Sequence, residues 1–132
     1  MKKKIHYLDE QELSDHIKRY DESGPNRIDQ HILSPTDYSW NHFFHEKEVD
    51  VDYFNIVWEQ EMVNGFSKFK IAEIKNDIIF IDYVGKFAQY EKLYSLRDIM
   101  KKSKILNVDI FNDEPFGKYV KRLYKLKMLL DE

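Results

Sequence analysis

The sequence of 132 residues contains no cysteine, only 3 prolines and 4 glycines, and no apolar run long enough to cross a bilayer. Without cysteine, disulfides, iron–sulfur clusters, cysteine-ligated zinc and thiol catalysis are all excluded. The scattered glycines form neither a phosphate-binding loop nor a dinucleotide fingerprint, and no Gly-x-Ser-x-Gly nucleophile elbow occurs. Acidic residues follow the lysines of the first positions, where a signal peptide would be apolar. We therefore expect a cytoplasmic protein without a membrane span.

The chain is rich in charged and aromatic residues. Charged residues make up 34% of the sequence and aromatic residues 15%, yet the formal net charge is only −3. Disordered chains combine few large apolar side chains with a strong net charge, so this composition predicts a folded protein. Because domains typically span about 100–150 residues, we expect a single domain over residues 1–132.

The two halves of the chain differ in charge. Residues 1–66 carry 7 basic and 14 acidic side chains, whereas residues 67–132 carry 14 basic and 10 acidic ones. Such an asymmetry indicates an oriented electrostatic field and a charged partner. The alternative is that the fold interleaves the two halves, so that the field averages away.

The apolar patterns predict an α+β fold, in which a small antiparallel sheet with a central hairpin is packed by the N- and C-terminal helices. The expected strands have β-branched or aromatic residues, at 5–8, 68–75, 78–84 and 105–111. The alternating residues 46–52 place four carboxylates on one side if this piece is extended. The expected helices repeat apolar residues every three or four positions, at 10–21, 51–63, 96–102 and 116–130. Asp9 and Ser95 are the expected N-caps of two of these helices. Residues 87–94 fit a helix or a third strand of the meander.

The clearest local signal is a hairpin that turns at Asn76-Asp77. Pairing around this turn places Ala72 opposite Ile81, and Ile71 opposite Asp82. Both faces of the resulting strand pair carry apolar residues, which predicts a covered, central position in the sheet.

Aromatic and acidic residues gather around positions 38–61 and form the first candidate site. Exposed aromatic side chains can anchor a partner, and carboxylates can steer a basic surface and pair with its Lys and Arg. The candidate partner-binding residues are Tyr38, Trp40, Glu46, Glu48, Asp50, Asp52, Glu59 and Glu61. The competing interpretation is that Trp40 and Trp58 belong to the core and the acids only keep the protein soluble.

From this surface the sequence predicts a non-enzymatic interaction module. The hypothesis is an inhibitor of the toxin-immunity or phage counter-defence type, which docks on a basic, nucleic-acid-handling enzyme such as a nuclease. Carboxylates suit that task because they can occupy the positions of phosphates in a basic cleft. No cofactor and no metal is expected.

Three other patterns leave alternatives open. The expected C-terminal helix is basic, and it predicts a nucleic-acid-binding module that would use Lys118, Lys121, Arg122 and Lys125. Glu73-Ile74-Lys75 has the Glu-x-Lys pattern of a metal-dependent nuclease strand, but it is also frequent by chance in so charged a chain. His42 and His45 are metal-ligand types beside acidic residues, although their setting favours a half-buried histidine pair in an aromatic loop.

Overall fold

The structure is a computed structural model, and it describes residues 1–23, 40–60, 69–75, 77–84, 90–109 and 117–131. These residues form three helices and six strands. In chain order the elements are β1 (Lys2–Leu8), α1 (Glu10–Ser23), β2 (Phe44–Asp50), β3 (Asn55–Gln60), β4 (Phe69–Ile74), β5 (Asp77–Val84), β6 (Tyr90–Ser95), α2 (Leu96–Leu106) and α3 (Gly117–Asp131). The predicted α+β class is confirmed.

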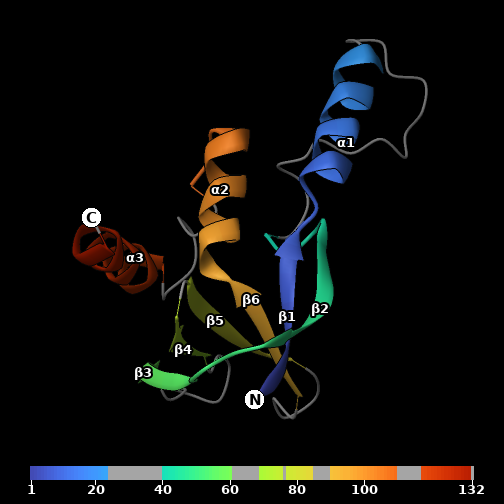
Figure 1. Cartoon of the computed structure of the whole chain (residues 1–132). Helices are drawn as coiled ribbons and strands as arrows, with labels where there is room; N and C mark the ends of the chain where they lie inside the picture. Colours follow the sequence, from blue (N-terminus) through green and yellow to red (C-terminus); the bar gives the residue numbers. More distant parts are fainter. Residues whose placement is uncertain (24–39, 61–68, 76, 85–89, 110–116, 132) are drawn as a thin grey trace.

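The six strands form one sheet in the order β2-β1-β6-β5-β4-β3. The sheet is mixed, because β1 and β6 run parallel while the other neighbouring strands are antiparallel. The hairpin of β4 and β5 lies inside the sheet, as the sequence predicted. Figure 1 shows α2 and α3 beside the strands, whereas α1 extends beyond the end of β1.

One face of the sheet is covered by α2 and α3. Its core joins buried side chains of β2, β4, β5 and β6 to helix residues, and consists of Phe44, Phe69, Ile71, Ile78, Phe80, Tyr94, Leu96, Ile99 and Val120. The N-terminal helix packs elsewhere: on α1, Leu13 and His16 are buried, and the His16 ring lies 5.1 Å from that of Phe43. The helix cover of the sheet therefore comes from α2 and α3, with α1 at the end of the sheet.

The opposite face has a second core, formed by Ile5, Val51, Ala72, Ile74, Ile79 and Ile81. It is closed by the segment 51–54, which connects β2 to β3 and crosses in front of the sheet in Figure 1. A flat sheet of six strands would be about 24 Å wide. The chain from the end of β2 to the start of β3 can span only about 17 Å. The sheet must therefore curl, which brings its two edge strands towards each other.

The hairpin of β4 and β5 is confirmed, but its register differs from the prediction by two residues. Ala72 pairs with Ile79, and Ile71 pairs with Phe80. The connection thus begins one residue earlier than Asn76-Asp77, because Asp77 already pairs with Ile74. A shift of two residues keeps every side chain on its predicted face, so both apolar faces are buried as expected.

The helix predicted over 51–63 is wrong within the described residues, which form β3 at Asn55–Gln60. The pairing with β4 shifts register between Ile56 and Trp58, so that Val57 is an extra residue in a bulge. The bulge interrupts the alternation of apolar and polar residues that would have identified a strand. Residues 61–63 lie outside the described residues.

The strand predicted over 105–111 is also wrong in its described part. Helix α2 continues to Leu106 and ends at Asn107, whose φ of 54° is the left-handed conformation of a C-cap. At its start, the Ser95 hydroxyl accepts a hydrogen bond from the Asp98 N–H, as predicted. The ambiguous segment 87–94 is a strand from Tyr90 onward. No helix among the described residues is long and apolar enough to cross a membrane.

Candidate functional site

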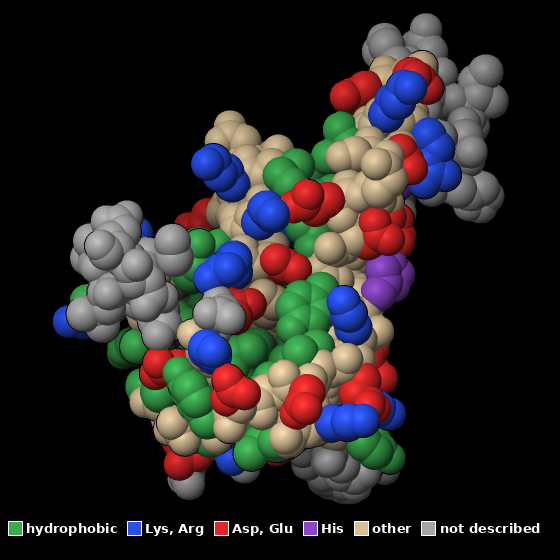
Figure 2. Space-filling view, in the orientation of Figure 1, with side chains coloured by type: hydrophobic (Ala, Val, Ile, Leu, Met, Phe, Trp, Pro, Cys, Tyr) green, Lys and Arg blue, Asp and Glu red, His purple; other side chains and the backbone are tan. Residues whose placement is uncertain are grey.

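The carboxylates of β2 lie opposite basic groups of β1 across the antiparallel ladder. Three ion pairs cross it: the Met1 α-amino group with Asp50 at 2.8 Å, Lys2 with Glu48 at 3.6 Å, and Lys4 with Glu46 at 3.9 Å. In Figure 2 acidic and basic side chains are accordingly interleaved over this part of the surface. The acidic segment that the sequence singled out is thus compensated by the Met1 α-amino group and two lysines, which the sequence pattern did not connect to it.

The remaining acidic candidates are paired in the same way where they are described. Asp52 lies 3.7 Å from the Lys75 ammonium group, and Glu59 lies 3.6 Å from that of Lys70. Tyr38 and Glu61 lie outside the described residues. The structure therefore places these candidates at both edges of the sheet, Glu46, Glu48 and Asp50 on β2 and Glu59 on β3, with Asp52 between them.

Trp40 packs against the core. Its ring makes edge contacts with Phe80 and Tyr94, at centroid distances of 5.4 and 4.7 Å. It lies in a turn whose Trp40 and His42 carbonyls accept hydrogen bonds from the buried Lys102 ammonium group. An indole held this way supports the core interpretation of Trp40, so we expect its removal to destabilise the fold.

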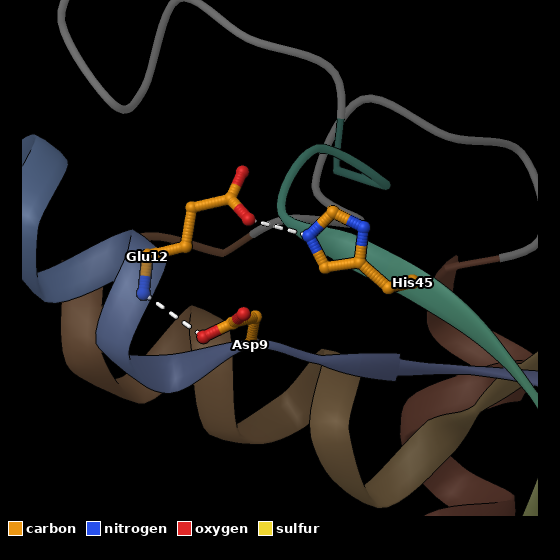
Figure 3. A group of neighbouring side chains, drawn as sticks. All are labelled: Asp9, Glu12 and His45. Atoms are coloured by element: carbon orange, nitrogen blue, oxygen red, sulfur yellow. Dashed lines mark hydrogen bonds and ion pairs between the residues drawn. The ribbon is translucent and has the colours of Figure 1, made fainter.

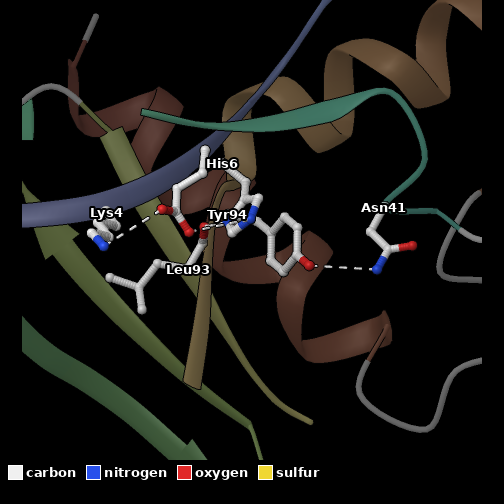
Figure 4. Close-up of polar contacts among 6 residues, drawn as sticks. Lys4, His6, Asn41, Leu93 and Tyr94 are labelled. Carbon is white, nitrogen blue, oxygen red and sulfur yellow. Dashed lines mark hydrogen bonds and ion pairs between the residues drawn. The ribbon is translucent and has the colours of Figure 1, made fainter. Parts of the chain in front are cut away.

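The turn at Trp40 is connected to the acidic strand through β6 (Figure 4). The His6 ring stacks on Tyr94 at 4.7 Å, and its Nδ1 lies 3.0 Å from the Leu93 carbonyl oxygen. The Tyr94 hydroxyl accepts a hydrogen bond from the Asn41 side chain. On the other side of the ring, His6 Nε2 lies 4.0 Å from a carboxylate oxygen of Glu46. These contacts fix the position of the aromatic turn relative to the β1–β2 ladder.

The four basic candidates lie on α3, but Lys121 has a different environment from the other three. Lys121 is half-buried and paired with Asp109 at 2.6 Å. Lys118, Arg122 and Lys125 are exposed, and at spacings of four and three residues they form one row on the helix surface. Among the described residues, no carboxylate forms an ion pair with these three cations.

An aromatic pair borders this row and was not predicted as a unit. Tyr119 of α3 stacks on Trp58 of β3, with ring centroids 5.4 Å apart and planes at 24°. Tyr119 is 49% exposed, and so is Leu126 on the same side of the helix. The predicted apolar face of α3 is therefore only partly buried: Val120 is fully covered, while Tyr119 and Leu126 reach solvent.

The metal-ligand types seen in the sequence are distributed differently in space. Among the described residues, one group of three could hold a metal, and it joins His45 to Asp9 and Glu12 and leaves out His42. The sequence pointed to Asp9 only as the N-cap of a helix. Glu73 does not belong to the group, so the nuclease hypothesis gains no support from its geometry.

A half-buried carboxylate occurs at Asp77, near the start of α2. Burial raises the pKa of Asp77, against the lowering effect of hydrogen bonds from the Ser95 hydroxyl and the Ile78 and Arg97 N–H groups. Asp77 extends the Ser95 cap of α2 by accepting from the Arg97 N–H. Its role is thus to join β5 to the start of the helix.

Comparisons with known proteins identify no relative. No protein-family model matches the chain, and neither the curated proteins nor the solved structures include a match to it.

Proposed function

We propose that this protein is a binding module that engages single-stranded nucleic acid through the exposed face of α3 and the adjoining Trp58. The observation that carries the proposal is the combination of Lys118, Arg122 and Lys125 in one row with the half-exposed Tyr119. Lysine and arginine bind backbone phosphates, and aromatic rings stack on unpaired bases. We call these four residues with Trp58 the α3 surface.

The arrangement suits a flexible single strand. One ring face of Tyr119 is supported by Trp58, so the phenol is held in place, and half of its surface is accessible. A base that stacks on Tyr119 would then lie beside Lys118, the preceding residue, and Arg122, three residues further along the helix. Recognition by stacking and phosphate contacts depends little on base sequence, so we expect weak sequence preference.

The acidic surface supports a second candidate function, the inhibitor that docks on a basic enzyme. Glu46, Glu48 and Asp50 have side chains between 51% and 74% exposed. Exposed ion pairs contribute only about 0–1 kcal/mol, so a partner's cations could replace the lysines of β1. The compensation within the ladder nevertheless weakens the attraction that a basic enzyme would experience, and we therefore rank this function second.

The test measures the fluorescence anisotropy of labelled oligo-dT and oligo-U mixed with the protein. Replacing Lys118, Arg122 and Lys125 together by Gln should abolish binding at moderate salt. With three phosphate contacts, log K should fall with log[salt] at a slope of about −2, since single strands contribute about −0.7 per contact. The matched control replaces the exposed Lys47, Lys92 and Lys104, which changes the net charge equally.

The aromatic contribution is tested separately. Tyr119→Ala should weaken binding about 5- to 150-fold, because one stacked base is worth about 1–3 kcal/mol. Tyr90→Ala is the control, since Tyr90 is 63% exposed and lies on β6. Equal losses of oligonucleotide affinity in the two triple variants would reject the proposal, and so would duplex DNA bound as tightly as the single strand. Binding of an oligo-arginine peptide that Asp50→Lys with Asp52→Lys abolishes would favour the inhibitor.

A further inference from the structure

Two carboxylates and an imidazole converge where β1 leads into α1. Asp9, Glu12 and His45 each offer one ligand atom, and these atoms all lie within 4.8 Å of one another. Figure 3 shows the His45 ring pointing from β2 towards the first turn of α1, where both carboxylates lie. Glu12 and His45 share a hydrogen bond, and the Asp9 side chain lies beside them.

The backbone fixes the three residues relative to one another. His45 pairs with Tyr7 in the β1–β2 ladder, and the ladder is extended by the Asp9 N–H, which donates to the Phe43 carbonyl at 2.8 Å. Helix α1 starts immediately afterwards, with Asp9 Oδ1 accepting from the Glu12 N–H at 3.0 Å. Strand pairing and helix capping therefore hold the three Cα positions, and only side-chain rotations remain to bring the ligand atoms together.

The donor set has a definite chemical preference. Imidazole nitrogen with carboxylate oxygen suits zinc and its first-row neighbours, whereas calcium and magnesium prefer oxygen ligands alone. Zinc bonds of about 2.0–2.2 Å in a tetrahedral arrangement place ligand atoms about 3.4 Å apart, which small rotations from the observed spacing achieve. We propose that Asp9, Glu12 and His45 form a binding site for a divalent transition metal of the zinc class.

The surroundings are consistent with an accessible ion. Two surface hollows, of about 680 and 670 Å³, adjoin at this point: Asp9 and Glu12 line one, and Asp9 and His45 line the other. Water or an external ligand could therefore complete the coordination that three protein ligands leave open. The site is separate from the α3 surface, and its failure would leave the proposed function untouched.

The test titrates purified protein with zinc chloride in a non-coordinating buffer by isothermal calorimetry. We expect a stoichiometry of one and a rise in the melting temperature, because a ligand that binds only the folded state stabilises it. Three variants remove single ligands with little effect on folding: Asp9→Asn keeps a good N-cap, Glu12→Gln keeps the capping-box pattern, and His45→Gln lies on an exposed strand position. Each should weaken zinc binding at least about tenfold.

The controls are His42→Gln and Asp15→Asn, which change a neighbouring histidine and another acid of α1 outside the group. Both should bind zinc as the parent protein does. Cobalt supplies a second readout, since its visible spectrum reports nitrogen and oxygen ligation and should change with His45→Gln alone among the histidine variants. The absence of zinc binding by the parent protein, or equal losses of zinc affinity in the ligand and control variants, would overturn the proposal.

Discussion

At the scale of single residues, Lys102 connects helix α2 to the turn that precedes β2. The side chain is 1% exposed, and its ammonium group donates to the Trp40 and His42 carbonyls at 3.1 and 2.9 Å. It also lies 5.3 Å from the ring centroid of Phe43, whose φ of 71° is a costly conformation for a bulky residue. Lys102 thus stabilises a strained turn, and burial lowers the pKa of its ammonium group to about 8.

This lowered pKa predicts a stability change in mild alkali. Between about pH 8 and pH 10.5 the unfolded chain binds the Lys102 proton and the folded protein does not, so stability rises with pH there. From about pH 7.5 to about pH 9.5 the contribution to the free energy of unfolding is about 2 kcal/mol. Urea unfolding at both pH values should show this increment in the parent protein and not in Lys102→Met. The same pH dependence in both proteins would contradict the assignment.

At the scale of elements, strand prediction succeeded where the signal was local. The β4–β5 hairpin has its apolar residues, its turn and its partner within one short stretch, and the Ser95 cap of α2 is likewise local. Strand β3 failed because a bulge at Val57 removes its alternation, and only pairing with β4 makes it a strand.

The spatial partners of the candidate site residues could not be predicted for a related reason. The Lys2–Glu48 and Glu12–His45 pairs join residues that are far apart in the sequence. Composition could indicate that acids and bases were present, but only the β1–β2 register shows which of them meet.

The ion pairs of Asp50 and Asp52, at and just beyond the end of β2, give a prediction about electrostatics. Asp50→Lys with Asp52→Lys replaces two exposed ion pairs by repulsion and should lower the free energy of unfolding by about 1–2 kcal/mol. The loss should disappear in about 1 M salt, where the screening length is about 3 Å. Asp50→Asn with Asp52→Asn, measured in parallel by urea unfolding, should lose less because it adds no repulsion. A loss that persists at high salt would mean that these carboxylates support the fold by something other than charge.

At the scale of the whole molecule, a single curled sheet carries a core on each face. Phe80 points to the core covered by α2 and α3, and its neighbour Ile81 points to the core closed by segment 51–54. Within the part of the chain that the structure describes, a few residues of irregular chain, with Val51 and Phe54 among them, cover the second core. Because the same strands supply both cores, loss of packing on one face removes the support of the other, and we infer that the two cores unfold together.

That coupling is tested with one substitution on each face. Ile81→Ala should lower the free energy of unfolding by about 2–5 kcal/mol and Phe80→Ala by about 3–5 kcal/mol, the cost of cavities in packed cores. Tyr90→Ala, at an exposed position of β6, should stay within about 0.5 kcal/mol of the parent protein. Circular dichroism and tryptophan fluorescence should give coincident urea transitions in both core variants. Separate transitions in Ile81→Ala, with the fluorescence of Trp40 and Trp58 in the helix-covered core retained after the circular dichroism signal has changed, would show that the face beneath segment 51–54 opens independently of the helices.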